Sequence, residues 1–256
     1  MMADVLSQAG LKVVLIEEGP LRSSSDFRMR EAEAYPDLYQ ESAARKTADK
    51  AINILQGRAV GGSTTVNWTS SFRTPAPTLA HWQSVHGLGE LSPEAMPNAN
   101  NEALRRGGQR LNIAVEVIPR NVRGCWNLGY CGMGCPTNAK QSMLVTTIPV
   151  ALDRGAVLYH GLRAQRLERS GDAITALHAV AMDAQGVQPR TVRVTVRARH
   201  YVLSAGAIGT PALMLRSDLP DPHERVGRRT FLHPTVVSAA LMPEAAEFEG
   251  CSRSSA

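Results

Sequence analysis

A glycine cluster between residues 57 and 67 is the part of the sequence best suited to hold a ligand. It reads Gly57-Arg58-Ala59-Val60-Gly61-Gly62-Ser63-Thr64-Thr65-Val66-Asn67 and is followed by Trp68. Consecutive glycines let backbone N–H groups approach an anion closely, and hydroxyl side chains add further donors. The cluster therefore indicates contact with a pyrophosphate or with the edge of a flavin ring. A flexible surface turn has a similar composition and is the alternative.

A pair of carboxylates, Glu17 and Glu18, follows the apolar run Val13–Ile16. In dinucleotide-binding βαβ units, a carboxylate at the tip of the second strand accepts hydrogen bonds from ribose hydroxyls. Glu17 occupies such a tip, which makes it a candidate ribose ligand. The glycine fingerprint that opens the helix of such a unit is absent, and an ordinary solvated charge is the alternative.

A third segment, Leu203–Pro211, places the small residues Ala205 and Gly206 at the start of an expected helix. Small residues at a helix start allow a ring or a phosphate to come close. Tight packing between a strand and a helix explains the same residues equally well.

Three cysteines, Cys125, Cys131 and Cys135, fall within eleven residues, while Cys251 stands alone. Zinc sites usually contain Cys-x2-4-Cys pairs, so the spacing Cys-x5-Cys-x3-Cys fits a metal site only in part. Packed thiols or one local disulfide are the simpler interpretations, and we predict no metal.

The elements that must position these groups are those of an α/β protein. A helical pattern through Val5, Leu6 and Ala9 stops at Gly10, and the following apolar run is typical of a strand in a parallel sheet covered by helices. Later segments alternate apolar and polar residues with a period of two, which predicts an antiparallel β-meander. The predicted strands span residues 13–16, 156–159, 176–183, 191–198 and 201–204.

The connecting regions have weaker patterns. Several prolines interrupt a region of about residues 70–145, which we predict to be an inserted loop or cap with short helical stretches at 80–85 and 102–111. Residues 142–154 are compatible with a helix or an extended segment. A last helix, with Pro211 in its first turn, is predicted to end near Arg216.

Composition excludes several classes of protein. Lys and Arg exceed Asp and Glu by 28 − 23 = 5, but the basic residues are scattered, so we expect no nucleic-acid partner. No run approaches the ~20 apolar residues that a membrane-spanning helix requires, and the start lacks a signal-peptide pattern. The expected location is the cytoplasm, with peripheral attachment to a membrane as the alternative.

In this order, the three glycine-containing segments resemble the glucose–methanol–choline (GMC) flavoprotein oxidoreductases. Residues 10–20 are similar to the second strand and ribose-binding carboxylate of that family, residues 57–67 to its first signature, and residues 206–215 to its second. The cysteine block Gly124–Pro136, followed by Asn138–Ser142, resembles the branch of long-chain alcohol oxidases and dehydrogenases. The implied fold is an incomplete FAD-binding, Rossmann-like parallel sheet with a β-meander.

The resemblance assigns four residues to the adenosine end of FAD. Glu17 would hold the ribose, and the backbone at Ala164 would bind adenine. Ala205 and Gly206 would pack near the same end.

Five further residues would line the rest of the cofactor. Gly61, Gly62 and Ser63 would lie along the pyrophosphate and flavin, and Asn67 and Trp68 would approach the isoalloxazine. The later Trp82 resembles a structural tryptophan of the family.

The implied reaction is hydride transfer from the carbon of an alcohol, possible substrates including long-chain alcohols, to flavin N5, with a histidine base taking the hydroxyl proton. We expect residues 1–256 to be a partial FAD-binding domain that lacks the first strand with its glycine fingerprint and the C-terminal half with the base. His233 matches an internal family position that is not the base, so no catalytic residue is predicted. The chain alone is expected to bind FAD weakly and to be inactive.

Two other functions share some of these features. A nicotinamide-dependent Rossmann dehydrogenase would explain Glu17 but not the glycine cluster. A non-catalytic or metal-binding interaction module would use Cys125, Cys131 and Cys135.

Overall fold

A parallel pair of strands forms the base of the fold. The computed structural model describes residues 1–70, 107–113, 120–228 and 230–232. Strand β1 (Val14–Glu17) pairs with β2 (Val157–His160) in a register that runs from Val14 opposite Val157 to Glu17 opposite His160. Because β1 precedes β2 by about 140 residues, the pair joins the beginning of the chain to a segment far along the sequence.

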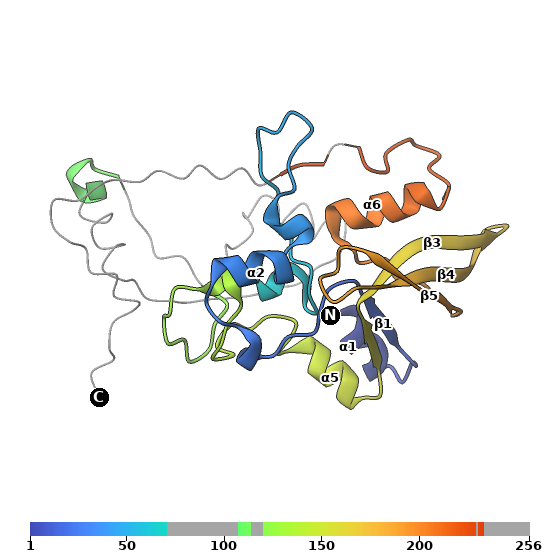
Figure 1. Cartoon of the computed structure of the whole chain (residues 1–256), viewed down its shortest axis with the longest axis horizontal. Helices are drawn as coiled ribbons and strands as arrows, with labels where there is room; N and C mark the ends of the chain where they lie inside the picture. Colours follow the sequence, from blue (N-terminus) through green and yellow to red (C-terminus); the bar gives the residue numbers. More distant parts are fainter. Residues whose placement is uncertain (71–106, 114–119, 229, 233–256) are drawn as a thin grey trace.

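Two short helices lie beside this pair (Figure 1). Helix α1 (Met2–Gln8) packs against α5 (Thr147–Asp153), and an ion pair between Asp4 and Arg154 links the two regions. Gly10 adopts a φ of +76° and ends the first helix, a conformation that costs glycine little.

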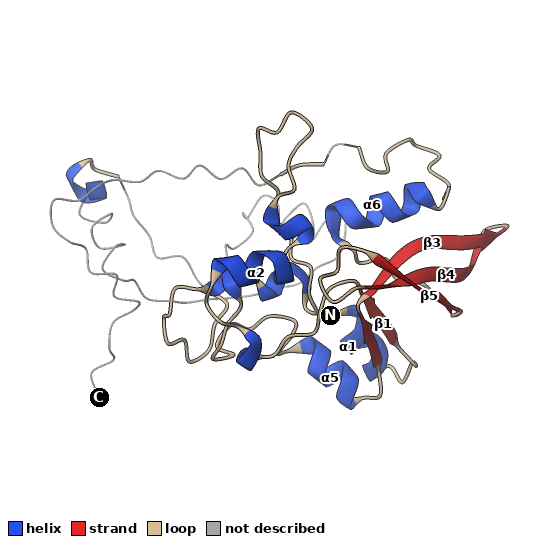
Figure 2. Cartoon of the chain, viewed as in Figure 1, coloured by secondary structure: helices blue, strands red, loops and turns tan. Residues whose placement is uncertain are grey.

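An antiparallel three-stranded sheet forms the second layer (Figure 2). Its strand order is β3 (Leu162–Ser170), β4 (Ala173–Met182) and β5 (Pro189–Val196). Helix α6 (Gly206–Arg216) lies against β3, where the Ser217 hydroxyl accepts a hydrogen bond from the Leu167 N–H at 2.9 Å. This contact covers the outer edge of β3.

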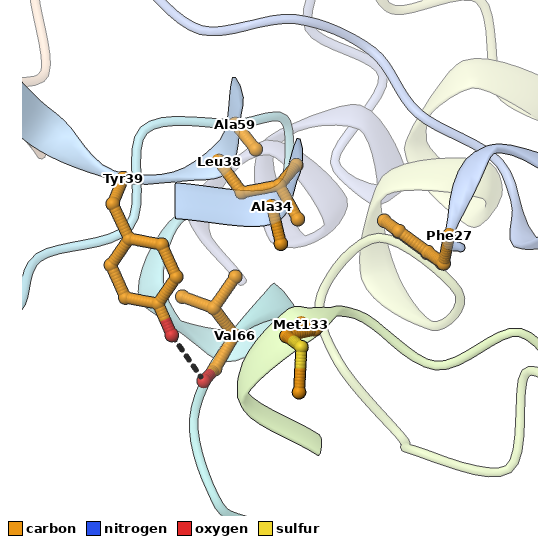
Figure 3. Close-up of a cluster of buried hydrophobic side chains, with 7 residues drawn as sticks. All are labelled: Phe27, Ala34, Leu38, Tyr39, Ala59, Val66 and Met133. Atoms are coloured by element: carbon orange, nitrogen blue, oxygen red, sulfur yellow. Dashed lines mark hydrogen bonds between the residues drawn. The ribbon is translucent and has the colours of Figure 1, made fainter. Parts of the chain in front are cut away.

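Irregular segments fill the space between these elements. They include helix α2 (Glu31–Leu38) and the short 3-10 turns η1 (Ser24–Asp26), η2 (Gln40–Ala43), η3 (Gly62–Thr65) and η4 (Cys131–Met133). Their apolar side chains form a compact cluster, shown in Figure 3. The cluster consists of Phe27, Ala34, Leu38, Tyr39, Ala59, Val66 and Met133.

Most predicted elements are present. The first helix, the strands at 13–16 and 156–159 and the final helix are confirmed, and residues 147–153 within the ambiguous 142–154 segment are helical. The predicted meander is confirmed in β4 and β5, which extend from 173 to 182 and from 189 to 196.

Two assignments differ from the prediction. Residues 201–204 were expected to form a strand, but no strand of the described chain pairs with them. Strand β3 was not predicted, because a bulge between Ala164 and Arg166 breaks the period-two pattern and its outward positions carry charges.

Some expectations lie outside the described residues. They concern the helical stretch at 80–85, the first half (102–106) of the stretch at 102–111, Trp82, His233 and Cys251; residues 107–110 are described and helical. Of the helices that the structure describes, none combines the length and the apolar character needed to traverse a bilayer.

The buried guanidinium of Arg58 joins the antiparallel sheet to helix α2. Only 6% of Arg58 is exposed, and its Nη2 donates to the carbonyl oxygens of Pro36 and Asp37, each at 3.2 Å, and of Gln185 at 3.0 Å. The turn between β4 and β5 packs on it so closely that a Cβ added at Gly186 would lie 1.8 Å from Arg58 Nη1. Arg58 therefore fixes the meander over the end of α2.

Replacement of Gly186 by alanine tests this contact. Gly186 has a φ of +67°, so Gly186→Ala introduces left-handed strain and also displaces the guanidinium. Gly171→Ala is the matched control, because Gly171 has a φ of +58° in the other hairpin turn with no atom within 4 Å of an added Cβ. We expect strain of roughly 1–2 kcal/mol in both variants and a further loss of about 1–3 kcal/mol in Gly186→Ala from unpaired buried groups. Chemical denaturation measures the difference; equal losses would show that Arg58 does not hold the turn.

Candidate functional site

The carboxylate of Glu17 lies at the carboxyl end of β1. One of its oxygens accepts the N–H of Gly19 at 2.8 Å. Burial raises the pKa of Glu17 above its ordinary value of 4.5, while the Gly19 hydrogen bond and the charge of Arg58 act in the opposite direction. Its neighbour Glu18 is paired with Arg163 at 2.9 Å, so Glu17 is the carboxylate without an arginine partner at this strand end.

Gly19 allows the end of β1 to lie directly on the glycine cluster. A Cβ at Gly19 would lie 2.3 Å from the carbonyl carbon of Arg58, and the Val60 N–H donates to the Pro20 carbonyl at 3.0 Å. The predicted ribose ligand and the predicted pyrophosphate loop are therefore adjacent.

The cluster folds into a tight turn with donors left over. Gly61 and Gly62 have φ values of +95° and +59°, and the hydroxyl of Ser63 accepts the Gly57 N–H at 2.9 Å. Within the described part of the chain, the Gly61 N–H, the Ser63 hydroxyl proton and the side-chain N–H groups of Asn67 have no acceptor, whereas the backbone N–H of Asn67 donates to the Ser63 carbonyl at 2.9 Å. This donor set fits an anion or the oxygen and nitrogen edge of a heterocycle.

The start of α6 lies beside the same loop. A Cβ added at Gly206, whose φ is +75°, would lie 3.4 Å from the side-chain nitrogen of Gln56, the residue before the cluster. No side chain caps α6; the Ala205 N–H instead donates to the Thr210 hydroxyl at 2.9 Å. An uncapped helix N-terminus attracts negative charge, which fits a pyrophosphate nearby.

Ala164 lies in β3 opposite Ala179, one residue beyond the arginine that binds Glu18. Since β1 and β3 pack together, the ion pair between Glu18 and Arg163 brings Ala164 to the same region as Glu17. The structure thus gathers the residues predicted for the adenosine end.

Asn67 and Trp68 are exposed at the other end of the loop. The indole of Trp68 lies on Gly132, where an added Cβ would be 2.9 Å from Cζ2. The cysteine block therefore supports the residue predicted to approach the isoalloxazine.

Two buried side chains that were not predicted hold this end together. Lys140, 3% exposed, donates from Nζ to the carbonyl oxygens of Thr65 at 2.9 Å, Asn67 at 2.7 Å and Cys131 at 2.7 Å. Burial lowers the pKa of Lys140 to about 8.

Tyr39 supplies the second connection. Its hydroxyl donates to the carbonyl oxygens of Gly132 at 2.6 Å and of Val66 at 3.3 Å, the latter drawn in Figure 3. Burial raises the pKa of Tyr39 to about 12, so it stays a donor at ordinary pH. Lys140 lies in the Asn138–Ser142 segment that resembles the long-chain branch, but no sequence pattern assigns a role to either residue, because their partners are backbone carbonyls.

The three cysteines of the block are free thiols with separate partners. Cys125 accepts the Asn127 N–H at 3.3 Å, Cys131 lies 3.2 Å from Arg120 Nη2, and Cys135 accepts the Lys140 N–H at 3.5 Å. Across the described residues, no group of three His, Cys, Asp or Glu side chains is arranged to hold a metal ion. The packed-thiol interpretation fits these contacts, and the disulfide does not.

The predicted residues occupy an exposed surface and not an enclosed cavity. A hollow of about 300 Å³ beside α2 is lined by Arg22, Phe27, Leu38 and Met133 among others, and by none of the predicted cofactor residues. A cofactor would therefore lie across the surface formed by β1, the glycine cluster and the start of α6.

Comparison with known proteins identifies the source of this geometry. A model of the GMC oxidoreductase family matches residues 35–98 and 90–235, which include the glycine cluster, β3 and the start of α6. The chain belongs to the GMC oxidoreductase family. This membership implies FAD as the cofactor, and it decides against the nicotinamide alternative.

Relatives of this GMC chain include plant and bacterial proteins. It is 32% identical over 270 residues to a long-chain-alcohol oxidase of Arabidopsis thaliana, covering 96% of this chain and 36% of that protein. It is 31% identical over 266 residues to an uncharacterized GMC-type oxidoreductase of Sinorhizobium fredii, covering 95% and 51%. The chain thus spans about a third to a half of the length of these curated relatives.

Solved structures agree on the fold. Pyridoxine 4-oxidase from Mesorbium loti matches with a TM-score of 0.54 at 20% identity, over 85% of this chain and 49% of that one. An FAD-dependent oxidoreductase from Chaetomium thermophilum matches with a TM-score of 0.57 at 14% identity, over 84% and 45%. The GMC chain therefore has the fold of FAD-dependent oxidoreductases.

Removal of the Tyr39 hydroxyl tests the connection beneath Trp68. Tyr39→Phe leaves the buried Gly132 carbonyl without this donor, and we expect a loss of about 1–3 kcal/mol in the free energy of unfolding. Tyr35→Phe is the control, because the two rings form an edge-to-face pair but the Tyr35 hydroxyl bonds the exposed Glu31. That control should change stability by less than about 0.5 kcal/mol. Thermal and chemical unfolding compare them, and similar losses would show that the buried hydrogen bond contributes little.

The raised pKa of Glu17 predicts a pH dependence of stability. Between 4.5 and the higher pKa of the folded state, the folded chain binds more protons than the unfolded chain, so stability falls as pH rises through this window. Glu17→Gln removes the penalty for a buried charge and should be at least as stable at neutral pH, with a flatter profile. Glu18→Gln instead loses the ion pair with Arg163 and should be slightly less stable. Chemical unfolding of both variants and of the parent, measured at intervals of about one pH unit from pH 4 to 8, checks both predictions. A Glu17→Gln variant that is less stable than the parent at neutral pH would contradict the expected effect of burial.

Proposed function

We propose that this chain binds FAD across the surface formed by β1, the glycine cluster and the start of α6, as part of an oxidoreductase that acts on the CH–OH group of alcohols. The observation that supports it is the convergence of Glu17, Gly61–Ser63 and Gly206, which are far apart in sequence and linked by the contacts at Gly19 and Gln56. The family match supports the choice of FAD.

The adenosine half is proposed to lie at the end of β1. The ionised carboxylate of Glu17 would accept hydrogen bonds from the ribose hydroxyls, and the backbone at Ala164 would bind adenine. Ala205 and Gly206 leave room at the uncapped start of α6, whose N–H groups favour the phosphates.

The flavin half is proposed to follow the loop toward Trp68. The N–H of Gly61 and the hydroxyl of Ser63 would donate to the pyrophosphate, and Asn67 and Trp68 would meet the ring. No atom lies within 4 Å of a Cβ added at Gly62. The space beside its backbone is therefore open, and a ring or phosphate can approach it.

Bound FAD would accept the hydride from the alcohol carbon. The residues named here bind and orient the cofactor, and none of them is assigned as the base that takes the hydroxyl proton. Relatives named as long-chain-alcohol oxidases favour a long-chain alcohol as the substrate.

A comparison of nucleotides tests the cofactor site. Titration of the chain against FAD, FMN and NAD⁺, followed by quenching of flavin fluorescence and by competition, should give saturable binding of FAD. Since Glu17 and Ala164 contact only the adenosine half, FMN should bind more weakly. Equal binding of FAD and FMN would remove the proposed adenosine contacts, and preference for NAD⁺ would overturn the choice of FAD. Because no base is assigned among these residues, we expect no anaerobic loss of flavin absorbance when a long-chain alcohol is added to this chain alone, and such a loss would contradict the expected inactivity.

Two glycines with the same backbone conformation provide a matched test of the loop. Gly62 and Gly124 both have a φ of +59° and both leave open space for a Cβ. Alanine at either position should therefore cost the same strain of roughly 1–2 kcal/mol. Only Gly62→Ala should weaken FAD binding, by about tenfold or more, equivalent to ~1.4 kcal/mol. Equal FAD affinities in the two variants would show that the cofactor does not pass over Gly62.

A further inference from the structure

Lys140 is a buried cation to which the proposed cofactor contacts assign no role. Its ammonium group has three donors, and three carbonyl oxygens accept them at 2.7–2.9 Å. Within the described residues, no carboxylate pairs with it. A charge is expensive to bury, so this match of donors to acceptors must offset much of the cost.

The three carbonyls belong to the two segments that meet where the Trp68 indole contacts Gly132. Those of Thr65 and Asn67 belong to the turn that leads into Trp68. That of Cys131 directly precedes Gly132, on which the indole ring lies. The ammonium group therefore links the two sides of this contact, as the Tyr39 hydroxyl does through Val66 and Gly132.

We propose that Lys140 is the positioning residue for Asn67 and Trp68 at the flavin end of the site, holding their backbone without touching the cofactor. This inference rests on the proposed function. Its effect on the ring would be indirect, through the orientation of these two residues.

The charge state of Lys140 should control this connection. Burial lowers its pKa to about 8, the nearby Arg120 acts in the same direction, and the thiols of Cys131 and Cys135 act against it. A neutral amine has only two donors and a lone pair, so one of the three carbonyls loses its partner. Above about pH 8, one of these three hydrogen bonds should therefore be lost, and the segment leading into Trp68 should be held less firmly.

Arg120 contacts the same two segments. Its Nε donates to the Thr69 hydroxyl at 2.9 Å and its Nη2 to Cys131 Sγ at 3.2 Å. The guanidinium of Arg120 therefore spans the two segments that Lys140 joins and provides a second connection between them. The titration is thus expected to change one connection and not to unfold the region.

Fluorescence of Trp68 tests the connection without any flavin. In a chain with Trp82→Phe and Trp126→Phe, Trp68 is the only tryptophan. We expect its emission to change in one step centred near pH 8, and we expect Lys140→Met to abolish the step. Lys12→Met, at an exposed lysine, should retain it.

Two further variants separate the lysine from its neighbours. Thiols titrate close to this range, so the step should persist in Cys131→Ser and Cys135→Ser. Lys140→Arg keeps the positive charge throughout, so its emission should not change near pH 8. A step that persists in Lys140→Met or disappears in both serine variants would overturn the proposal, as would the absence of a step in the parent chain. If Lys140→Met does not fold, the parent and Lys140→Arg titrations still decide.

FAD affinity then separates this proposal from the proposed function. Lys140→Met should bind FAD about tenfold more weakly at neutral pH, and the parent should lose affinity as pH rises through 8. Unchanged affinity in Lys140→Met, with FAD still bound by the parent, would overturn the positioning role alone. A parent that binds no FAD would overturn the proposed function, and the Trp68 titration would still decide whether Lys140 holds this segment.

Discussion

Buried backbone carbonyls without sheet or helix partners are the constraint on which this structure depends. The loops that form the proposed site run through the interior, and a buried carbonyl without a donor is costly. Arg58 and Lys140 donate to six loop or helix-end carbonyls between them, three each, in partly or fully buried hydrogen bonds, and the Tyr39 hydroxyl donates to two more. Long cationic side chains suit this task because each carries several donors that can be aimed in different directions.

Arg58 and Lys140 hold the backbone at opposite ends of the proposed site. Arg58 fixes the end near Glu17, where the meander, α2 and the glycine cluster meet. Lys140 fixes the end near Trp68, where the cluster meets the cysteine block. Guanidinium and ammonium are not interchangeable here: the first stays charged, whereas the second can lose its proton when buried. The proposed adenosine end therefore contains a guanidinium group, and the proposed flavin end contains an ammonium group whose pKa is lowered by burial.

Sequence reasoning reached the parts of this arrangement that leave a local pattern. The apolar run at 13–16, the period-two strands of the meander and the glycine cluster each have a residue signature, and the structure confirms the elements they predict. Strand β3 escaped because its bulge interrupts the alternation, and residues 201–204 look like a strand although no described strand pairs with them. Propensity alone does not provide a pairing partner.

Lys140 and Tyr39 escaped for a different reason. Their partners are main-chain oxygens of residues that lie 9–75 positions away from Lys140 and 27 or 93 positions away from Tyr39. Every residue has such an oxygen, so the residue types in the sequence do not reveal these contacts. A lysine beside cysteines looks like an ordinary surface charge until the fold removes it from water. The candidate cofactor ligands could be named from the sequence, whereas the groups that position them could not.

Two titrating groups, Glu17 and Lys140, set the pH range in which the proposed site has both of its charged side chains. Glu17 accepts hydrogen bonds from ribose hydroxyls most strongly when it is ionised, and burial raises the pH at which it ionises. Lys140 must be protonated to hold all three carbonyls, and burial lowers the pH at which that charge is lost. Desolvation of Glu17 thus raises the lower limit of the pH range in which both groups are charged, and desolvation of Lys140 lowers its upper limit. A ligand that binds only the ionised Glu17 must lower the pKa of that carboxyl as it binds, so FAD binding near this pKa should release a proton. At the flavin end the linkage has the opposite sign: a ligand that requires the charged Lys140 would raise its pKa and extend the range upward.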